Sequence, residues 1–149
     1  MIRGAGRKIF KKIAKETPGV GLRVHLLKLI GIKIGEKTYI AEGLTIAENL
    51  ENPQLIIIGD RVAIGPEVIL ITSSHPNYSI LKEIYGIRKG SITIRDDAWI
   101  GARVIIFPGI TIGSRAVVGA GAVVTESVPD DTIYVGAIGT GRFIKRELG

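Results

Sequence analysis

The stretch that decides the fold is ITIRDDAWIGARVIIFPGITIGSRAVVGAGAVVTESV, residues 92–128. Counted in sixes from Ile94, each phase position holds a β-branched aliphatic residue, and the position four residues further on is again compact and apolar. The residue after the aliphatic is often glycine, as at Gly101 and Gly113. This period fits neither a helix nor simple strand alternation. It predicts a triangular coil with one short strand on each face and a turn after each strand.

The same repeat, in the same phase, also runs from residue 34 to His75, with one interruption at Asn52-Pro53. Its phase positions there are Ile34, Ile40, Ile46, Ile58, Ile64 and Leu70. We interpret the aliphatic residues as pointing into the prism, and the glycines that follow them as adopting backbone angles that a Cβ would penalise. The sequence therefore predicts an all-β fold, a parallel β-helix of hexapeptide repeats over residues 32–135.

Residues 76–93 break the repeat. Their phase positions are Pro76, Lys82 and Arg88, none of which suits a dry interior. We expect an extruded loop here, after which the repeat resumes in the same phase. Because long loops on a regular scaffold often carry function, the loop is a candidate for shaping a substrate site. The alternative is a surface decoration without a role.

The first 31 residues are expected to form a short helical cap. Ile2, Ala5, Ile9 and Ile13 fall on one helical face, with lysines and arginines around the remainder. Thr17-Pro18 is typical of a helix start, and the second helix should end near Gly31. One interpretation is a cap on the open end of the coil. The other is a basic interfacial helix that contacts an anionic membrane. The two are compatible.

Composition limits the function classes. The chain has 149 residues, enough for one domain, and no cysteine, which excludes disulfides and thiolate catalysis. Its net charge of +6 favours an anionic partner such as a phosphorylated cofactor or a lipid surface. Few aromatic residues make nucleic acid the weakest option. No apolar run is long enough to span a bilayer and no signal-peptide pattern is present, so we expect a cytoplasmic protein, peripheral to a membrane at most.

His75 is the only histidine in the coil region, and it lies where the repeats give way to the loop. An imidazole is a natural general base for a hydroxyl nucleophile at neutral pH. Such a base would take the proton of an attacking alcohol directly, without a covalent intermediate. A zinc-dependent carbonic anhydrase on a coil of this kind needs three histidine ligands, and the chain has only His25 and His75.

The repeats, together with SSHPNYS, DDAWIG, PGITIG and VVGAGAVVT, resemble the hexapeptide-repeat acyltransferases, most closely the galactoside, maltose and capsule-sugar O-acetyltransferase group. The resemblance covers roughly residues 31–146. It implies a left-handed β-helix, a homotrimer with active sites between neighbouring prisms, and acetyl-CoA as acyl donor, with no metal required. It implies O-acetylation of a sugar or glycan precursor with His75 as catalytic residue. An N-acetyltransferase acting on an amino sugar or antibiotic, and an inactive trimeric scaffold, remain alternatives.

The resemblance also implies binding residues. It puts Trp99, Ala102, Ala120 and Thr125 on the path of the acyl donor. The C-terminal tail, residues 136–149, would meet the nucleotide phosphates through Arg142, Lys145 and Arg146. The acceptor-side residues follow from the interruptions of the repeat and not from the resemblance. Asn77 and Tyr78 should lie at the base of the loop, and Asn49 lies on the polar turn of residues 48–53, which could reach an acceptor or form a solvated corner. Glu126 stands where relatives commonly have a lysine, and the tail lacks their proline.

Overall fold

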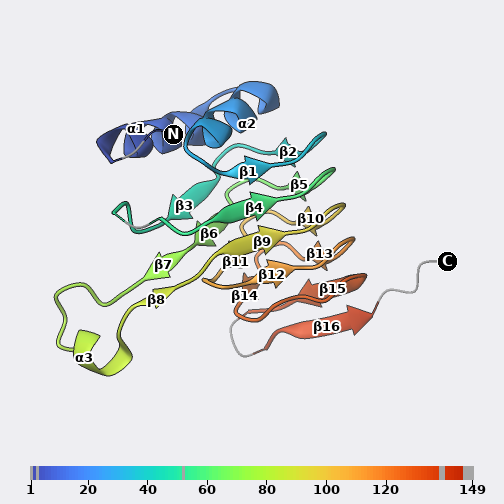
Figure 1. The fold of residues 1–149 in the computed structure, drawn as a ribbon. Coiled ribbons are helices and arrows are strands. Elements are labelled where there is room, and N and C mark those ends of the chain that lie inside the picture. Colours follow the sequence, from blue (N-terminus) through green and yellow to red (C-terminus); the bar gives the residue numbers. More distant parts are fainter. Residues whose placement is uncertain (1, 3, 52, 138–139, 146–149) are drawn as a thin grey trace.

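The chain winds into a triangular prism whose three faces are small parallel sheets (Figure 1). A computed structural model describes residues 2, 4–51, 53–137 and 140–145. Each turn of the coil contributes one strand to sheet A, then sheet B, then sheet C. Sheet A contains β1 (Lys33–Ile34), β4 (Ile56–Ile58), β9 (Ile92–Ile94) and β12 (Thr111–Ile112). Sheet B contains β2 (Tyr39–Ile40), β5 (Ala63–Ile64), β10 (Trp99–Ile100), β13 (Val117–Val118), β15 (Thr132–Val135) and β16 (Arg142–Lys145). Sheet C contains β3 (Thr45–Ala47), β6 (Ile69–Ile71), β11 (Ile105–Ile106) and β14 (Val123–Val124).

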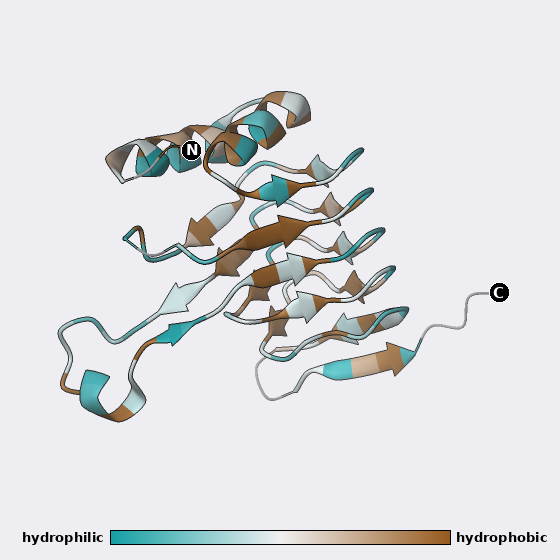
Figure 2. Ribbon diagram, in the orientation of Figure 1, coloured by the Kyte–Doolittle hydropathy of each residue, from teal (hydrophilic) through white to brown (hydrophobic). Residues whose placement is uncertain are grey.

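The register of the sheets stacks the repeat on itself. Ile94 pairs with Ile58 on one side and with Ile112 on the other. The phase residues and the compact residues four positions on are buried together in one core, among them Ile40, Ile64, Ile100, Ile106, Val104 and Ala116. In Figure 2 the strands of the coil carry brown, apolar segments, several of them next to pale or teal ones, and the turns between the strands are mostly paler or teal. The predicted coil, with one strand on each face, is confirmed.

The glycines of the repeat are needed for a different reason from the one predicted. A Cβ on Gly101 would lie 2.6 Å from the backbone nitrogen of Ala120 on the next coil, so the limit is close stacking. The left-handed backbone falls instead on turn residues such as Arg61 and Asp97, with φ of 52° and 61°. These two side chains form an exposed ion pair at 2.7 Å across neighbouring coils.

The loop leaves the prism as a two-stranded antiparallel ribbon. Strand β7 (Ser73–Ser74) pairs with β8 (Arg88–Lys89), and the short helix α3 (Lys82–Tyr85) lies between them (Figure 1). At the base of the ribbon, the Gly90 N–H donates to the Thr72 carbonyl at 3.0 Å. The excursion therefore begins at Ser73, slightly earlier than the sequence predicted, and its two ends meet.

Two helices cover one end of the prism, α1 (Ala5–Glu16) and α2 (Val20–Leu29) (Figure 1). The sequence predicted that Thr17 starts the second helix, but in the structure Thr17 ends the first helix. Its hydroxyl donates to the Ile13 carbonyl at 2.6 Å. The N-cap of α2 is Gly19. Among the described residues, no helix is long and apolar enough to cross a bilayer.

The face of α1 that turns inward is not its apolar face. Ile9 and Ile13 are 57% and 49% exposed, whereas Arg7 and Ala14 are buried. The cause is an ion pair, because Arg7 donates two hydrogen bonds to the Glu48 carboxylate at 2.7 and 2.8 Å and Lys11 lies 3.0 Å from it. Glu48 thus neither forms a solvated corner nor reaches out to an acceptor. It joins the helical cap to the coil.

The Glu48 side chain has no exposed surface. Burial by itself would raise the pKa of this carboxyl, but the hydrogen bonds from Arg7 and Lys11, together with their charges, outweigh burial and hold the pKa of Glu48 below its ordinary value. The Glu48 carboxylate is therefore ionised at neutral pH, and it neutralises part of the positive charge of α1.

At the other end of the prism, β16 folds back antiparallel to β15. The buried Tyr134 ring meets the Phe143 ring edge-on, with centroids 5.2 Å apart. The Tyr134 hydroxyl donates to the Val123 carbonyl at 3.1 Å, which ties the last strand of the coil to the one before it.

Candidate active site

A cavity of about 370 Å³ lies at the base of the loop. The ribbon and the loop supply most of its wall, and one residue comes from the turn after β11. The lining residues are Ser74, His75, Pro76, Tyr85, Gly86, Arg88 and Phe107. The cavity combines an imidazole, a hydroxyl, a guanidinium and two aromatic rings, which is a chemistry suited to a polar ligand with an apolar face.

His75 is exposed to the cavity rather than packed inside its own prism. Its Nδ1 accepts a hydrogen bond of 3.3 Å from the Asn77 backbone N–H, and Asn77 has a left-handed φ of 53°. Because an N–H can only donate, the neutral imidazole in this arrangement carries its proton on Nε2. A base that acts through Nε2 must give up this long hydrogen bond and move its proton to Nδ1.

The edge between sheets C and A, which we call the C–A edge, brings several of the predicted residues together. Ile106 pairs with Leu70 and with Val124, so the residues that follow these strands occupy one edge on successive coils. Phe107 lies on the coil after the loop, and Thr125 on the next. Asn49 follows β3 on the coil before the loop, where its side chain accepts the Glu51 N–H at 2.9 Å.

The edge between sheets B and C, the B–C edge, carries the predicted alanines. Ala102 and Ala120 are stacked there on successive coils, and the Gly121 N–H donates to the Ala102 carbonyl at 2.8 Å. Neither alanine is buried. Among the described residues, none accepts a hydrogen bond from the Ala102 or Ala120 N–H. Small side chains beside free backbone donors suit an extended ligand that runs along the coils.

A single chain does not bring all the predicted residues to one site. Trp99 is 60% exposed on the outer face of sheet B, between Ala63 and Val117, and it does not line the His75 cavity. Tyr78 is fully exposed and lines no part of that cavity. The exposed side chains of Arg142 and Lys145 lie on β16 at the far end of the prism. The predicted Arg146 lies outside the described residues.

Of the residues that line the cavity, only His75 was assigned to the site from the sequence. Arg88 stood out only as a break in the repeat, and Tyr85 and Phe107 did not stand out at all. Phe107 occupies the position after the aliphatic, where glycine is common elsewhere in the repeat. A large aromatic residue there, next to the coil that carries the loop, is a signal that could have identified it.

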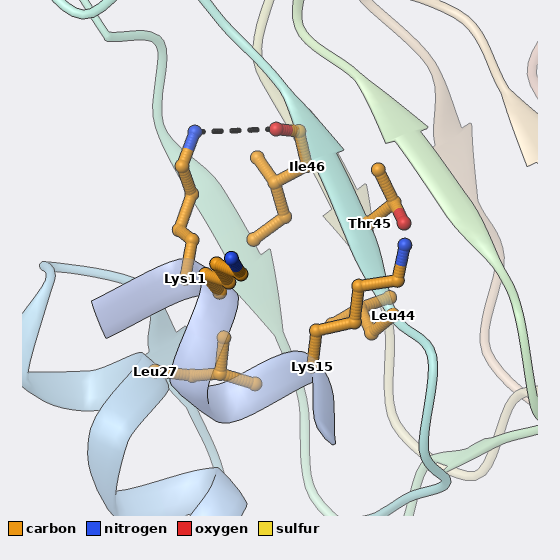
Figure 3. A pocket seen from close by; sticks show the side chains of 7 residues that line it. Lys11, Lys15, Leu27, Leu44, Thr45 and Ile46 are labelled. Carbon is orange, nitrogen blue, oxygen red and sulfur yellow. Dashed lines mark hydrogen bonds between the residues drawn. The ribbon is translucent and has the colours of Figure 1, made fainter. Parts of the chain in front are cut away.

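A second cavity, of about 180 Å³, lies at the seam between α1 and β3 (Figure 3). Its apolar floor includes Leu27 and Leu44, and Lys11 crosses it to donate to the Ile46 carbonyl at 3.2 Å. The seam is where the helical cap packs on the first coil, and no residue of the loop lines it.

Comparison with known proteins identifies the family of this fold. The hexapeptide repeat of succinyl-transferase matches residues 91–126. The galactoside O-acetyltransferase of Escherichia coli K12 is 37% identical over 105 residues, which are 70% of this chain and 50% of that protein. The putative acetyltransferase YvoF of Bacillus subtilis is 31% identical over 126 residues, which are 84% of this chain and 68% of that protein. The chain thus spans about half the length of the galactoside enzyme that it matches.

A similar solved structure is the hexapeptide-repeat acetyltransferase VCA0836 of Vibrio cholerae in complex with acetyl-coenzyme A. It has a TM-score of 0.73 and 28% identity, and the match covers 96% of this chain and 86% of that one. This likeness supports the predicted left-handed parallel β-helix, with its helical N-terminus and parallel sheets. The repeat, the fold and these relatives together show that the chain belongs to the hexapeptide-repeat acetyltransferase family.

Proposed function

We propose that this protein is an acetyl-CoA-dependent O-acetyltransferase that acetylates a hydroxyl of a sugar or glycan precursor, with His75 as general base. The observation that carries the proposal is the exposed imidazole in a cavity at the base of the loop, on a family scaffold. Ser74 adds a hydroxyl to the same cavity, and Tyr85 and Phe107 add aromatic faces on which the apolar side of a sugar ring can rest.

The chemistry needs one proton shuttle. His75 removes the proton of the acceptor hydroxyl as its oxygen attacks the thioester carbonyl. The tetrahedral intermediate then expels the CoA thiolate as the C–S bond breaks, and the imidazolium returns the proton to sulfur. No enzyme nucleophile is consumed, so the cavity requires no serine or cysteine in that role. The products are an acetyl ester and free CoA thiol.

The donor fits the B–C edge. A pantetheine arm is narrow and carries amides, so it can hydrogen-bond the free N–H groups of Ala102 and Ala120 on successive coils. Thr125 belongs to the C–A edge, and Arg142 and Lys145 supply positive charge at the far end for the nucleotide phosphates. In this proposal the arm runs parallel to the prism axis, with its thioester towards the loop.

The two edges must face one another for the reaction, and we propose a homotrimer in which they come from neighbouring chains. The outer face of sheet B exposes Trp99 and Tyr39 as large apolar side chains. Parallel packing of three prisms buries such a face and brings one subunit's C–A edge beside the next subunit's B–C edge. Sedimentation equilibrium would test the assembly directly.

Complementation tests the shared site. His75→Ala removes the base, and Ala120→Trp blocks the donor edge. Each variant alone should be inactive. If the site uses His75 of one subunit and Ala120 of the next, random trimers refolded from an equal mixture should regain roughly a quarter of the parent activity, because one interface in four then has both groups intact. Mixtures that regain none would place both residues in one subunit's site.

The function itself is tested by a thiol-release screen with acetyl-CoA and a panel of sugars, amino sugars and lipid-linked glycans. The proposal expects thiol release that depends on a hydroxylated acceptor, with an ester product identified by mass spectrometry. An amide product would identify an N-acetyltransferase instead. Absence of thiol release with every acceptor would favour an inactive scaffold.

We further propose that the helical cap contacts an anionic membrane. Ile9 and Ile13 on α1, and Leu22 and Leu29 on α2, are large apolar side chains that are 40–57% exposed. The helices pack against each other, and Figure 2 shows brown segments beside teal ones on both. An apolar face bordered by lysines complements an anionic bilayer in both hydrophobicity and charge. A parallel trimer would present three such caps on one side.

This contact predicts binding to vesicles that contain phosphatidylglycerol and weak binding to pure phosphatidylcholine. Replacing Ile9 and Ile13 by serine should lower the bound fraction by roughly 10-fold or more, because two insertable side chains are lost. The matched control is Ile80→Ser with Ile84→Ser, two residues of the loop that are 79% and 71% exposed. Cosedimentation measures both. Equal binding of the cap variant and the parent would overturn the membrane proposal.

A further inference from the structure

The inference concerns Arg88, a cation in the His75 cavity. Strand β8 lies antiparallel to β7, and the register sets Arg88 opposite Ser74 and Lys89 opposite Ser73. Residues that are directly opposite on a ribbon share one face, and their neighbours along the strand share the other. Ser74 and Arg88 both line the cavity, and Lys89 and Ser73 do not. Of the adjacent cations Arg88 and Lys89, the ribbon thus places only Arg88 on the cavity face, opposite Ser74, the residue that precedes His75.

Arg88 also differs from the arginines of the coil. Arg61, Arg103 and Arg115 each form an ion pair with an acid of a neighbouring coil, at 2.5–2.7 Å. Among the described residues, no carboxylate pairs with Arg88. None of the cavity-lining residues is acidic either. The guanidinium therefore keeps its full capacity for a carboxylate or a phosphate, either of which it can bind through two parallel hydrogen bonds.

From these observations we infer that the acceptor is anionic, a sugar that carries a carboxylate or a phosphate, and that Arg88 is the residue that selects it. This inference rests on the proposed acetyl transfer. His75 is only one residue beyond Ser74, so an acceptor whose anionic group meets Arg88 holds its ring in the cavity with hydroxyls near the imidazole. The aromatic walls formed by Tyr85 and Phe107 fit the ring, and neither competes for the charge.

The alternative ligand for Arg88 is a phosphate of the acyl donor. The geometry disfavours it, because the cations proposed for the nucleotide end lie on β16, the last strand of sheet B, three strands beyond β10 of the coil that follows the loop (Figure 1). The two ligands also differ in a measurable way. A residue that selects the acceptor changes KM for the acceptor, whereas a residue that binds the donor changes KM for acetyl-CoA.

The test compares three acceptors with one ring, namely methyl glucoside, methyl glucuronide and glucose 1-phosphate, in the thiol-release assay. With the parent, kcat/KM should be higher for one or both of the charged acceptors than for the neutral one, and the better of the two identifies carboxylate or phosphate. Arg88→Gln should raise KM for that acceptor by roughly 10- to 100-fold, with kcat and the KM for acetyl-CoA little changed. The KM of Arg88→Lys for that acceptor should lie between those of the parent and Arg88→Gln, because an ammonium keeps the charge but cannot make the bidentate contact.

Lys89→Gln is the matched control, since it removes the same charge from the adjacent residue on the other face of the ribbon. It should leave all constants unchanged. If Arg88→Gln and Lys89→Gln raise the KM for the acceptor equally, the effect comes from net charge alone and the inference is overturned. It is also overturned if the parent has a higher kcat/KM for the neutral sugar than for the charged ones. A raised KM for acetyl-CoA in Arg88→Gln would assign the residue to the donor.

Calorimetric binding of methyl glucuronide and glucose 1-phosphate separates this inference from the proposed reaction. If no acceptor releases thiol, the proposed function fails, but binding of either anion by the parent that is lost in Arg88→Gln still supports the assignment of Arg88. If the parent and Arg88→Gln bind both anions equally, or if neither protein binds them, the inference fails, whatever the activity.

Discussion

Replacing His75 by alanine is expected to lower kcat for acetyl transfer by about 10²- to 10⁴-fold, the usual contribution of a positioned general base. The alanine variant cannot accept the hydroxyl proton, so the acceptor oxygen must attack while still protonated. The side chain is exposed and makes one long hydrogen bond to the backbone, so its removal should leave the fold intact. The measurement is thiol release at saturating acetyl-CoA, with circular dichroism to verify folding.

The matched control for this substitution is His25→Ala. His25 is the other histidine of the chain, exposed on α2, and it belongs to the cap rather than the loop. The control should retain the parent kcat. If His75→Ala transfers acetyl as fast as the parent, the imidazole is not the base, and the mechanism fails even though the fold and family stand.

The largest effect on stability is expected from Glu48→Ala. Removing the carboxylate leaves Arg7 buried without its partner, and breaking a buried ion pair in this way typically costs about 3–5 kcal/mol. Thermal unfolding should show a clear drop in Tm. The matched control is Glu67→Ala, which removes an acid that is ion-paired with Arg103 at 2.5 Å but is largely exposed. That change should cost about 1 kcal/mol or less.

The same carboxylate makes stability depend on pH. Because the pKa of Glu48 is lowered in the folded protein, its contribution is fully present above the ordinary value of 4.5 and is lost as the pH falls through the folded pKa. The parent should therefore lose more stability than Glu48→Gln between pH 5 and the acid limit of folding. Parallel stability curves for the two proteins over that range would contradict the role of Glu48.

The regular part of the fold was predictable because each coil repeats one local rule. An aliphatic residue every six positions fixes which side chains enter the prism, and the register then follows from stacking. His75 could be located for the same reason, since an interruption of a strict repeat is easy to see. The helical cap did not follow such a rule. Apolar spacing placed Ile9 and Ile13 on one face of α1 but did not say whether that face turns inward. In the structure the inward face carries Arg7 instead, which is ion-paired with Glu48, 41 residues away.

The composition of the cavity also exceeded what the sequence revealed. Arg88 looked like one more polar residue of an irregular segment, because its relation to Ser74 exists only once two strands pair in a specific register. Phe107 comes from a different coil and reaches the cavity only through stacking. Long-range pairings of this kind leave no periodic trace in the sequence, so the lining of the cavity had to come from the structure.

The hydrogen bond between Thr72 and Gly90 has a consequence for how such proteins diversify. It joins the two stems of the loop, so the coils above and below pack as though the intervening residues were absent. A longer, shorter or unrelated insert could be exchanged between these stems with little disturbance to the spiral, because the entropy of closing a loop grows only slowly with its length. In the proposed mechanism, exchange of the loop would change the selectivity for the acceptor while the B–C edge, to which the acyl donor is assigned, stays the same.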